Sequence, residues 1–137
     1  MSYTFAMIKP DAVEAGNSGL IIHMIENHGF TIVRMEKRTV DVPTAECFYA
    51  IHRARPFFKE LVDFITSGPV IVMALEREDA VVQWRTLMGA TNPKDAAAGT
   101  IRRLYGTSIG ANAAHGSDSP DTAASELGIF FPDLVRM

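Results

Sequence analysis

The sequence predicts an α+β protein in which helices cover one face of an antiparallel sheet. Short β-prone segments and helical patterns follow one another in the order strand, helix, two strands, helix and strand, with additional helices between them. The chain is 47% hydrophobic and 21% charged, which is the balance of an ordinary globular protein. A chain of 137 residues has room for one hydrophobic core, so we expect residues 1–137 to form a single domain.

The first strand and the first helix are predicted near the start of the chain. Residues 3–8 form a short apolar, β-prone run, and Pro10 stops strand pairing because it lacks a backbone donor. Asn17 or Ser18 can then cap a helix whose apolar residues recur at helical spacing. Gly29 is placed to end this helix.

The middle of the chain predicts two more strands with two short helices between them. Residues 30–42 are rich in Val, Ile and Thr and predict a strand. Helical stretches at 44–52 and 56–66 follow, the second beginning with a proline. Residues 70–75 are continuously apolar and too few for a typical helix, which predicts a central strand buried on both faces.

The last part of the chain predicts two helices separated by a long loop. Residues 79–88 carry apolar side chains at helical spacing. Regular patterning weakens over 89–120, and a loop of that length in a compact domain is commonly functional. Ser119 can cap a helix that we expect to run to about Glu126, and residues 129–131 predict a final strand.

Composition narrows the compartment and the classes of partner. The net charge of -3 gives no general attraction to nucleic acid or to anionic membranes. Cys47 is the single cysteine, which suits a reducing compartment, and we expect it to be buried and inert. Residues 1–10 lack the pattern of a signal peptide, and no segment is long enough to cross a bilayer. We therefore expect a cytoplasmic protein with no membrane partner.

His115 is a candidate nucleophile. It lies in the run Asn112–Ser119, where glycine gives backbone freedom and exposure. Imidazole titrates near ~6.5, so much of it is neutral at cellular pH and has a lone pair for attack on phosphorus. A carboxylate on the opposite ring nitrogen would fix the tautomer, and Glu126 and Asp118 are the nearest in sequence. A loop histidine without a role is the alternative.

Cationic and aromatic side chains form two further sets of candidates. Phosphoryl transfer needs donors for the charged equatorial oxygens, and the candidates are Lys9, Arg85, Thr91 and Arg102. The alternative for each cation is that it is simply solvated or paired with one of the 16 acidic residues. A nucleotide base can stack on an aromatic ring, for which Tyr49, Phe57 and Phe58 are available, although core packing is the commoner use.

Several familiar nucleotide and metal motifs are absent from the sequence. There is no G-x-x-x-x-G-K-[ST] phosphate loop, no G-x-G-x-x-G and no DFG triplet. The histidines His23, His28 and His52 are not arranged with cysteines or acids as a zinc set. Any phosphate site must therefore be built from dispersed residues.

The run Asn112–Ser119 resembles the signature N-x-x-H-G-S-D-S of the nucleoside diphosphate kinase family. The likeness extends over almost the whole chain, and its other blocks occur in family order: Ile8-Lys9-Pro10-Asp11, Arg55-Pro56-Phe57-Phe58, Ser67-Gly68-Pro69-Val70, Met88-Gly89-Ala90-Thr91-Asn92-Pro93 and Gly99-Thr100-Ile101-Arg102.

This resemblance implies a fold and an activity. The fold would be a ferredoxin-like βαββαβ sandwich with a four-stranded antiparallel sheet covered by helices. The activity would be ping-pong transfer of the terminal phosphoryl group from a nucleoside triphosphate, mainly ATP, to a nucleoside diphosphate. His115 would be phosphorylated on Nδ1, Mg²⁺ would be the cofactor, and the protein would be a homo-oligomer, either a tetramer or a hexamer.

The resemblance also implies roles for individual residues. Glu126 would hold the other side of the imidazole with Ser117 nearby, while Tyr49 and Lys9 would line the path of the phosphoryl group. The nucleotide contacts would be Lys9 and Asn112 on the sugar hydroxyl, Arg85, Thr91 and Arg102 on the phosphates, and Phe57 on the base with Ile109 beneath it. Asp118 would steady the magnesium ion through water, and the nucleotide phosphates would supply its other ligands.

One departure and two alternatives remain. Arg103-Leu104 stand where many relatives have a small residue and an acid, which could alter loop pairing or subunit contacts. A non-catalytic nucleotide-binding module on the same fold is one alternative activity. An RNA-binding ferredoxin-like domain is the other, but the chain lacks the aromatic and basic strand motif of such domains, so we expect no dedicated nucleic-acid binding.

Overall fold

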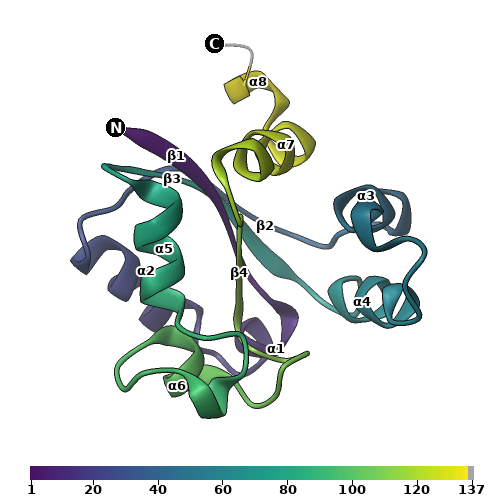
Figure 1. Ribbon diagram of the computed structural model, residues 1–137, viewed down its shortest axis with the longest axis horizontal. Coiled ribbons are helices and arrows are strands. Elements are labelled where there is room, and N and C mark those ends of the chain that lie inside the picture. Colours follow the sequence, from purple (N-terminus) through teal and green to yellow (C-terminus); the bar gives the residue numbers. More distant parts are fainter. Residues whose placement is uncertain (136–137) are drawn as a thin grey trace.

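A four-stranded antiparallel sheet forms the centre of the computed structural model, which describes residues 1–135. The strands are β1 (Ser2–Ile8), β2 (Thr31–Arg38), β3 (Val70–Arg77) and β4 (Ala114–Gly116). Their order in the sheet is β2-β3-β1-β4, and each neighbouring pair is antiparallel (Figure 1). The predicted α+β class, the four-stranded antiparallel sheet and the central position of 70–75 are confirmed.

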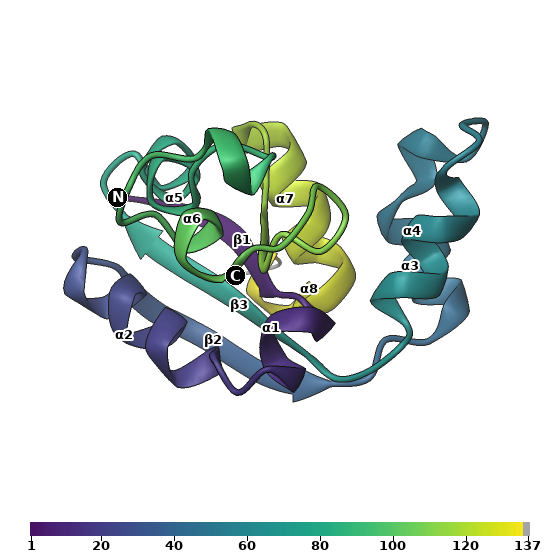
Figure 2. The same cartoon turned by 90° about the horizontal axis from the view of Figure 1, so that it is seen from below.

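Helices surround this sheet. They are α1 (Pro10–Glu14), α2 (Ser18–Asn27), α3 (Val42–Phe48), α4 (Phe58–Ile65), α5 (Ala80–Met88), α6 (Ile101–Tyr105), α7 (Pro120–Phe130) and α8 (Pro132–Val135), with 3-10 turns at Ala50–His52 and Pro93–Asp95. Figures 1 and 2 both show α3 and α4 standing to one side of the sheet. None of the helices in the described part of the chain is both long and apolar enough to span a membrane.

The prediction that helices cover only one face of the sheet is wrong. Alternate residues of β3 enter two separate clusters of buried side chains. Met73 and its alternate neighbours pack with α2 and α5, whereas Val72 and its alternate neighbours pack with α3, α4 and α7. Because β3 is apolar on both sides, each face needs its own cover.

The predicted final strand at 129–131 is also wrong. Helix α7 continues through Gly128 to Phe130, because glycine is tolerated within a helix at modest cost. Leu127 and Phe130, three positions apart, are both buried against the same cluster. The N–H of Phe131 donates to the carbonyl of Leu127 at 2.7 Å, which prolongs the helical pattern.

The fourth strand lies instead inside the segment predicted as a long loop. β4 has three residues, too few to produce a periodic signal, and it pairs with β1 along Ala6–Ile8. The same segment contains α6 and a 3-10 turn. The predicted strand 30–42 is shorter than expected because the Asp41 side chain accepts from the Thr44 N–H at 2.8 Å and starts α3. Cys47 is exposed, so its predicted burial is wrong.

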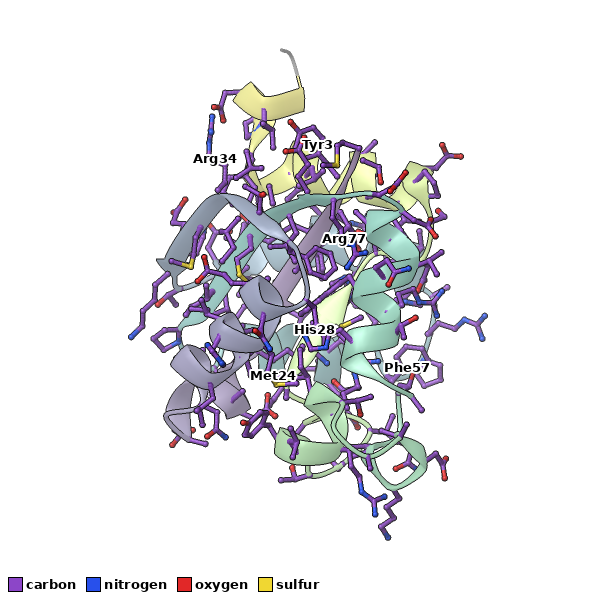
Figure 3. All side chains as sticks on the ribbon, turned by 90° about the vertical axis from the view of Figure 1, so that its left-hand side faces the viewer. Tyr3, Met24, His28, Arg34, Phe57 and Arg77 are labelled. Atoms are coloured by element: carbon purple, nitrogen blue, oxygen red, sulfur yellow. The ribbon has the colours of Figure 1, made fainter. Side chains whose placement is uncertain are left out.

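One ion pair joins the C-terminal helix to the far edge of the sheet. Arg34 of β2 extends toward α8, where its guanidinium donates to the carboxylate of Asp133 at 2.6 Å (Figure 3). Both side chains are substantially exposed, so the pair contributes little stability.

Gly116 allows β4 to approach α5 closely. A methyl group on this residue would overlap the indole of Trp84 and the end of Met88, both fully or nearly fully buried. We expect Gly116→Ala to lower the free energy of unfolding by about 1 to 3 kcal/mol, the usual cost of overpacking a core. Denaturant unfolding would measure it. Gly19→Ala is the control, since Gly19 has open space around it; equal loss in both variants would contradict the argument.

Candidate active site

His115 lies on the edge strand β4, opposite Met7 of β1. The indole N–H of Trp84 donates to its carbonyl at 3.2 Å, and the ring of Phe48 meets its imidazole edge-on with centroids 4.8 Å apart. The imidazole remains 23% exposed. The prediction that His115 lies in a loop is therefore wrong, because its backbone belongs to strand β4. The predicted exposure of its side chain to solvent is found, because part of the imidazole ring is not covered.

A carboxylate holds one nitrogen of this ring. Nε2 of His115 lies 3.0 Å from Oε2 of Glu126, and the Ser117 hydroxyl donates to Oε1 of the same carboxylate at 2.6 Å. An ionised carboxylate accepts only, so in the neutral imidazole the tautomer that fits this contact carries its proton on Nε2 and keeps the lone pair on Nδ1. Within residues 1–135, Nδ1 has no hydrogen-bond partner. Of the two candidate acids, Glu126 is the one that contacts the ring.

Lys9 is the most buried cation in this region. It precedes α1, is 9% exposed, and its ammonium donates to Oδ1 of Asn112 at 2.9 Å. Burial, and secondarily the charge of Arg102, lower the pKa of Lys9 from 10.5 to about 8, while Asp11 opposes the shift. The ammonium is thus still mainly charged at neutral pH, and it is poorly hydrated.

Arg102 is anchored by two backbone carbonyls. Its guanidinium donates to Gly89 at 3.0 Å and to Ala114, the residue before the histidine, at 2.9 Å. Burial, followed by repulsion from Arg85, lowers the pKa of Arg102 to about 10, with Asp118 acting in the opposite direction. These contacts fix the guanidinium beside β4.

Arg85, Thr91 and Arg102 line a single pocket of about 540 Å³ between α5 and the segment 89–102. His115 does not line this pocket, but two residues that precede it in the chain form hydrogen bonds with residues that do. Arg102 contacts Ala114, and the carboxamide N–H of Asn112 donates to the carbonyl of Thr91 at 3.0 Å. The three predicted phosphate ligands are therefore brought together next to the strand that carries the histidine.

Tyr49 ends α3 and is 8% exposed. Its ring packs edge-on against Phe48, the same side chain that contacts His115. Burial, and then the charge of Glu126, raise the pKa of Tyr49 to about 12. The phenol therefore stays protonated at neutral pH and can donate a hydrogen bond.

The predicted base contacts are more exposed than the rest of the site. Phe57 is 42% exposed just before α4, with its ring centroid 5.5 Å from that of His52, and Ile109 is 59% exposed in the loop before β4. Phe58 is half-buried, as expected for one of two adjacent phenylalanines. In Figure 3, Phe57 lies at the margin of the molecule.

Asp118 follows β4 and is 77% exposed, with one carboxylate oxygen 4.0 Å from the Arg85 guanidinium. Within residues 1–135, no three His, Cys, Asp or Glu side chains are grouped as a metal site.

Sequence reasoning missed three residues that shape this site. Phe48 supports the imidazole ring, Trp84 holds its backbone, and Asp11 accepts from the N–H of Ala113 at 3.1 Å. Asp11 belongs to a recognised motif, but nothing in the sequence connects it to a residue 102 positions away. Phe48 and Trp84 have the pattern of ordinary core residues.

The fold and the site together define a class of protein: an α+β protein that presents a carboxylate-bound histidine beside a pocket lined with arginines, as a phosphotransferase does. A family model described as "Nucleoside diphosphate kinase" matches residues 2–135. The chain belongs to the nucleoside diphosphate kinase family, whose members are phosphotransferases.

Individual relatives agree with this placement. The nucleoside diphosphate kinase of Desulfotalea psychrophila is 54% identical to this chain, over 98% of this chain and 98% of that protein. The nucleoside diphosphate kinase of Deinococcus radiodurans is 53% identical, over 97% of this chain and 96% of that protein. The solved structure of the Aquifex aeolicus nucleoside diphosphate kinase superposes with a TM-score of 0.95 at 40% identity, covering 97% of this chain and 96% of that one. The halophilic enzyme from Halobacterium salinarum, solved in complex with CDP, gives 0.91 at 45% identity, with 95% and 87% covered. The ferredoxin-like fold is thereby confirmed.

Proposed function

We propose that this chain moves the terminal phosphoryl group of a nucleoside triphosphate, mainly ATP, to a nucleoside diphosphate through a phosphohistidine at His115. The observation that carries the proposal is the bond between Nε2 and Glu126, which leaves Nδ1 as the nucleophile. In the first half-reaction, Nδ1 attacks the terminal phosphorus, and the bond to the leaving diphosphate oxygen breaks with its electron pair. In the second, a diphosphate oxygen attacks the same phosphorus and restores the imidazole.

Glu126 and Ser117 would act on the charge that the imidazole gains. As Nδ1 bonds to phosphorus, the ring becomes cationic, and the carboxylate 3.0 Å away stabilises it. The short hydrogen bond from Ser117 keeps that carboxylate in the plane that Nε2 requires. Both residues therefore orient the nucleophile, and neither needs to exchange a proton with the substrate.

Cationic and neutral donors would stabilise the phosphoryl group in transit. Lys9 and Arg102 would supply positive charge from partly buried positions, where such charge is worth more than in water, and the more exposed Arg85 would add to it. Thr91 adds a neutral contact in the same pocket. The Tyr49 phenol, protonated because its pKa is about 12, can donate to the phosphoryl oxygens.

The site would bind the nucleotide base without distinguishing its identity and would bind the sugar through specific polar contacts. Phe57 and Ile109 are both exposed, and any flat base would stack on Phe57 with Ile109 beneath the base, whereas Lys9 and Asn112 would bind the sugar hydroxyl. Their mutual hydrogen bond fixes both groups before the substrate arrives. This arrangement supports the use of many different nucleotides, because stacking on an aromatic ring does not depend on which base is present.

Mg²⁺ fits the donors of this site. Magnesium in phosphoryl-transfer enzymes is commonly held by one or two carboxylates plus substrate phosphates, and Asp118 offers one exposed carboxylate beside Arg85. We propose that the nucleotide phosphates hold the ion and that Asp118 steadies it through water. Bound there, the ion would neutralise phosphate charge.

We also propose a single domain over residues 1–137, a cytoplasmic location and a homo-oligomer, either a tetramer or a hexamer, with no membrane or dedicated nucleic-acid partner. Apolar side chains that the isolated chain leaves exposed support the oligomer, and they include Leu20, Met35, Val42 and Leu104.

Incubation with labelled Mg-ATP tests the proposed function. The wild-type protein should acquire one acid-labile, base-stable phosphoryl group per chain and release it to GDP as GTP. Steady-state rates with both nucleotides varied should give parallel reciprocal plots, the pattern of a covalent intermediate. Intersecting plots, or a protein that stays unlabelled, would exclude the mechanism.

A further inference from the structure

The backbone bends sharply just before the strand that carries the nucleophile. Ala113 has a φ of +76°, in the left-handed region that residues other than glycine rarely occupy. The bend is tight enough for the N–H of Ala114 to donate to the carbonyl of Asn112 at 2.9 Å. Ala113 is fully buried. The conformation therefore needs support from its surroundings.

That support comes from the beginning of α1. Oδ2 of Asp11 accepts from the N–H of Ala113 at 3.1 Å, and the N–H of Lys9 donates to the carbonyl of Ala113 at 2.9 Å. Both polar backbone groups of Ala113 are thus held by one short segment. The other carboxylate oxygen, Oδ1, is buried and has no partner among residues 1–135.

The residues on either side of the bend are those of the proposed site. Asn112 lies between the Lys9 ammonium and the carbonyl of Thr91, and Ala114 accepts from Arg102. His115 follows directly. The conformation of Ala113 therefore sets the position of the Asn112 carboxamide relative to the imidazole.

Asp11 also acts on Lys9 by charge. The charged groups that influence the Lys9 ammonium are Asp11 of α1, which raises its pKa, and Arg102 of α6, which lowers it. Loss of the Asp11 charge would leave repulsion from Arg102 and burial unopposed, so the pKa of Lys9 would fall further below 8.

We propose that Asp11 is a positioning residue of the phosphoryl-transfer site: its carboxylate holds Ala113 in the left-handed bend that presents Asn112 and His115, and its charge stabilises the Lys9 ammonium. The inference rests on the proposed function. The simpler alternative is that Asp11 serves only as a favourable acid in the first turn of α1. That role would not involve Ala113 or Lys9.

Four variants separate the two contributions. Asp11→Asn keeps an acceptor oxygen for Ala113 and removes the charge, whereas Asp11→Ala removes both. Ala113→Gly lowers the cost of the positive φ and is combined with Asp11→Ala. Glu14→Gln, an exposed acid of the same helix, is the matched control for charge loss in α1.

The first readout is the single-turnover rate of His115 phosphorylation by Mg-ATP, measured on folded protein. Asp11→Ala should slow it by on the order of tenfold, because a buried N–H loses its acceptor beside the nucleophile. Adding Ala113→Gly should recover on the order of fivefold, since glycine adopts the bend without strain. Glu14→Gln should match the wild type. A purely helical role for Asp11 predicts no recovery from a change at position 113.

The second readout is the alkaline limb of the pH profile of that rate. In Asp11→Asn the limb should move to lower pH than in the wild type, whereas in Glu14→Gln it should not move. Because this variant keeps the acceptor, it also tests the proposal if Asp11→Ala fails to fold.

The outcomes distinguish the two levels of proposal. A wild type that takes no phosphoryl group from Mg-ATP overturns the proposed function and this inference together. A wild type that is labelled normally, with Asp11→Ala as fast as Glu14→Gln or with no recovery from Ala113→Gly, overturns the positioning role alone. An unmoved alkaline limb in Asp11→Asn overturns the charge role.

Discussion

Replacing His115 with alanine is expected to lower kcat for phosphoryl transfer by a factor on the order of 10⁴ to 10⁶, the scale on which loss of a covalent nucleophile acts. The remaining donors would still bind both nucleotides, since Lys9, Arg85 and Arg102 do not depend on the imidazole for their contacts. The measurement is GTP formation from ATP and GDP, together with labelling by Mg-ATP.

His23→Ala is the control for this experiment, because His23 is an exposed histidine of α2 outside the site. It should keep the wild-type rate and the label. Retention of a stable phosphoryl group by His115→Ala would show that another residue is the carrier and would refute the assignment.

Replacing Lys9 with methionine is expected to lower kcat by on the order of 10² to 10³, the usual effect of removing one preorganised charge from a transition state. Methionine keeps most of the length and apolar contact of the lysine stem, so packing should be preserved. The loss should fall mainly on kcat, because charge on the moving phosphoryl group matters most in the transition state.

The same variant should also change how stability depends on pH. The pKa of Lys9 is about 8 in the folded protein and 10.5 ordinarily. Between these values the unfolded chain binds a proton that the folded chain does not, so the free energy of unfolding rises with pH in that window. The cost of burying the ammonium is fully present below about pH 8 and amounts to on the order of 1 to 3 kcal/mol.

Denaturant unfolding at a series of pH values checks this. Wild-type stability should rise between pH 8 and 10.5 on account of Lys9, and Lys9→Met should lack that part of the rise. A methionine variant whose pH dependence matches the wild type would contradict the lowered pKa. An active-site charge would in this case be maintained at the expense of stability.

The sheet and the helices could be predicted where the signal was long. The continuous apolar run of β3 and the helical spacing of α5 each left one interpretation, and both were found. β4 could not be found, because three residues between a bend and a helix carry no period. Residues 129–131 gave a wrong prediction although they do carry a local signal, a β-prone run after Gly128. Residues 129 and 130 belong to α7 instead, because the helical conformation buries Phe130 in the core.

The site divides in the same way. His115 and the nearby cations could be recognised from the sequence because they lie in short motifs that resemble those of a known family. In the structure, Glu126 contacts the imidazole, and the three candidate phosphate ligands line one pocket. The residues alone left Glu126 and Asp118 both open, and the family resemblance implied Glu126, which is the acid that contacts the ring in the structure. The contact of Asp11 could not be predicted from the sequence, because its partner is a backbone N–H, which every residue except proline possesses.

The hydrogen bond between Lys9 and Asn112 joins residues 103 positions apart in the sequence. Strand β1 likewise pairs on one side with β4, which is synthesised much later. During synthesis, Lys9 leaves the ribosome well before His115 and Glu126, which follow it by 106 and 117 positions. A nascent or truncated chain would therefore expose the interior side of β1 and possess no carrier of phosphate. A chain whose synthesis has not yet passed His115 and Glu126 therefore lacks the proposed carrier and the carboxylate that holds it, and cannot consume nucleoside triphosphates.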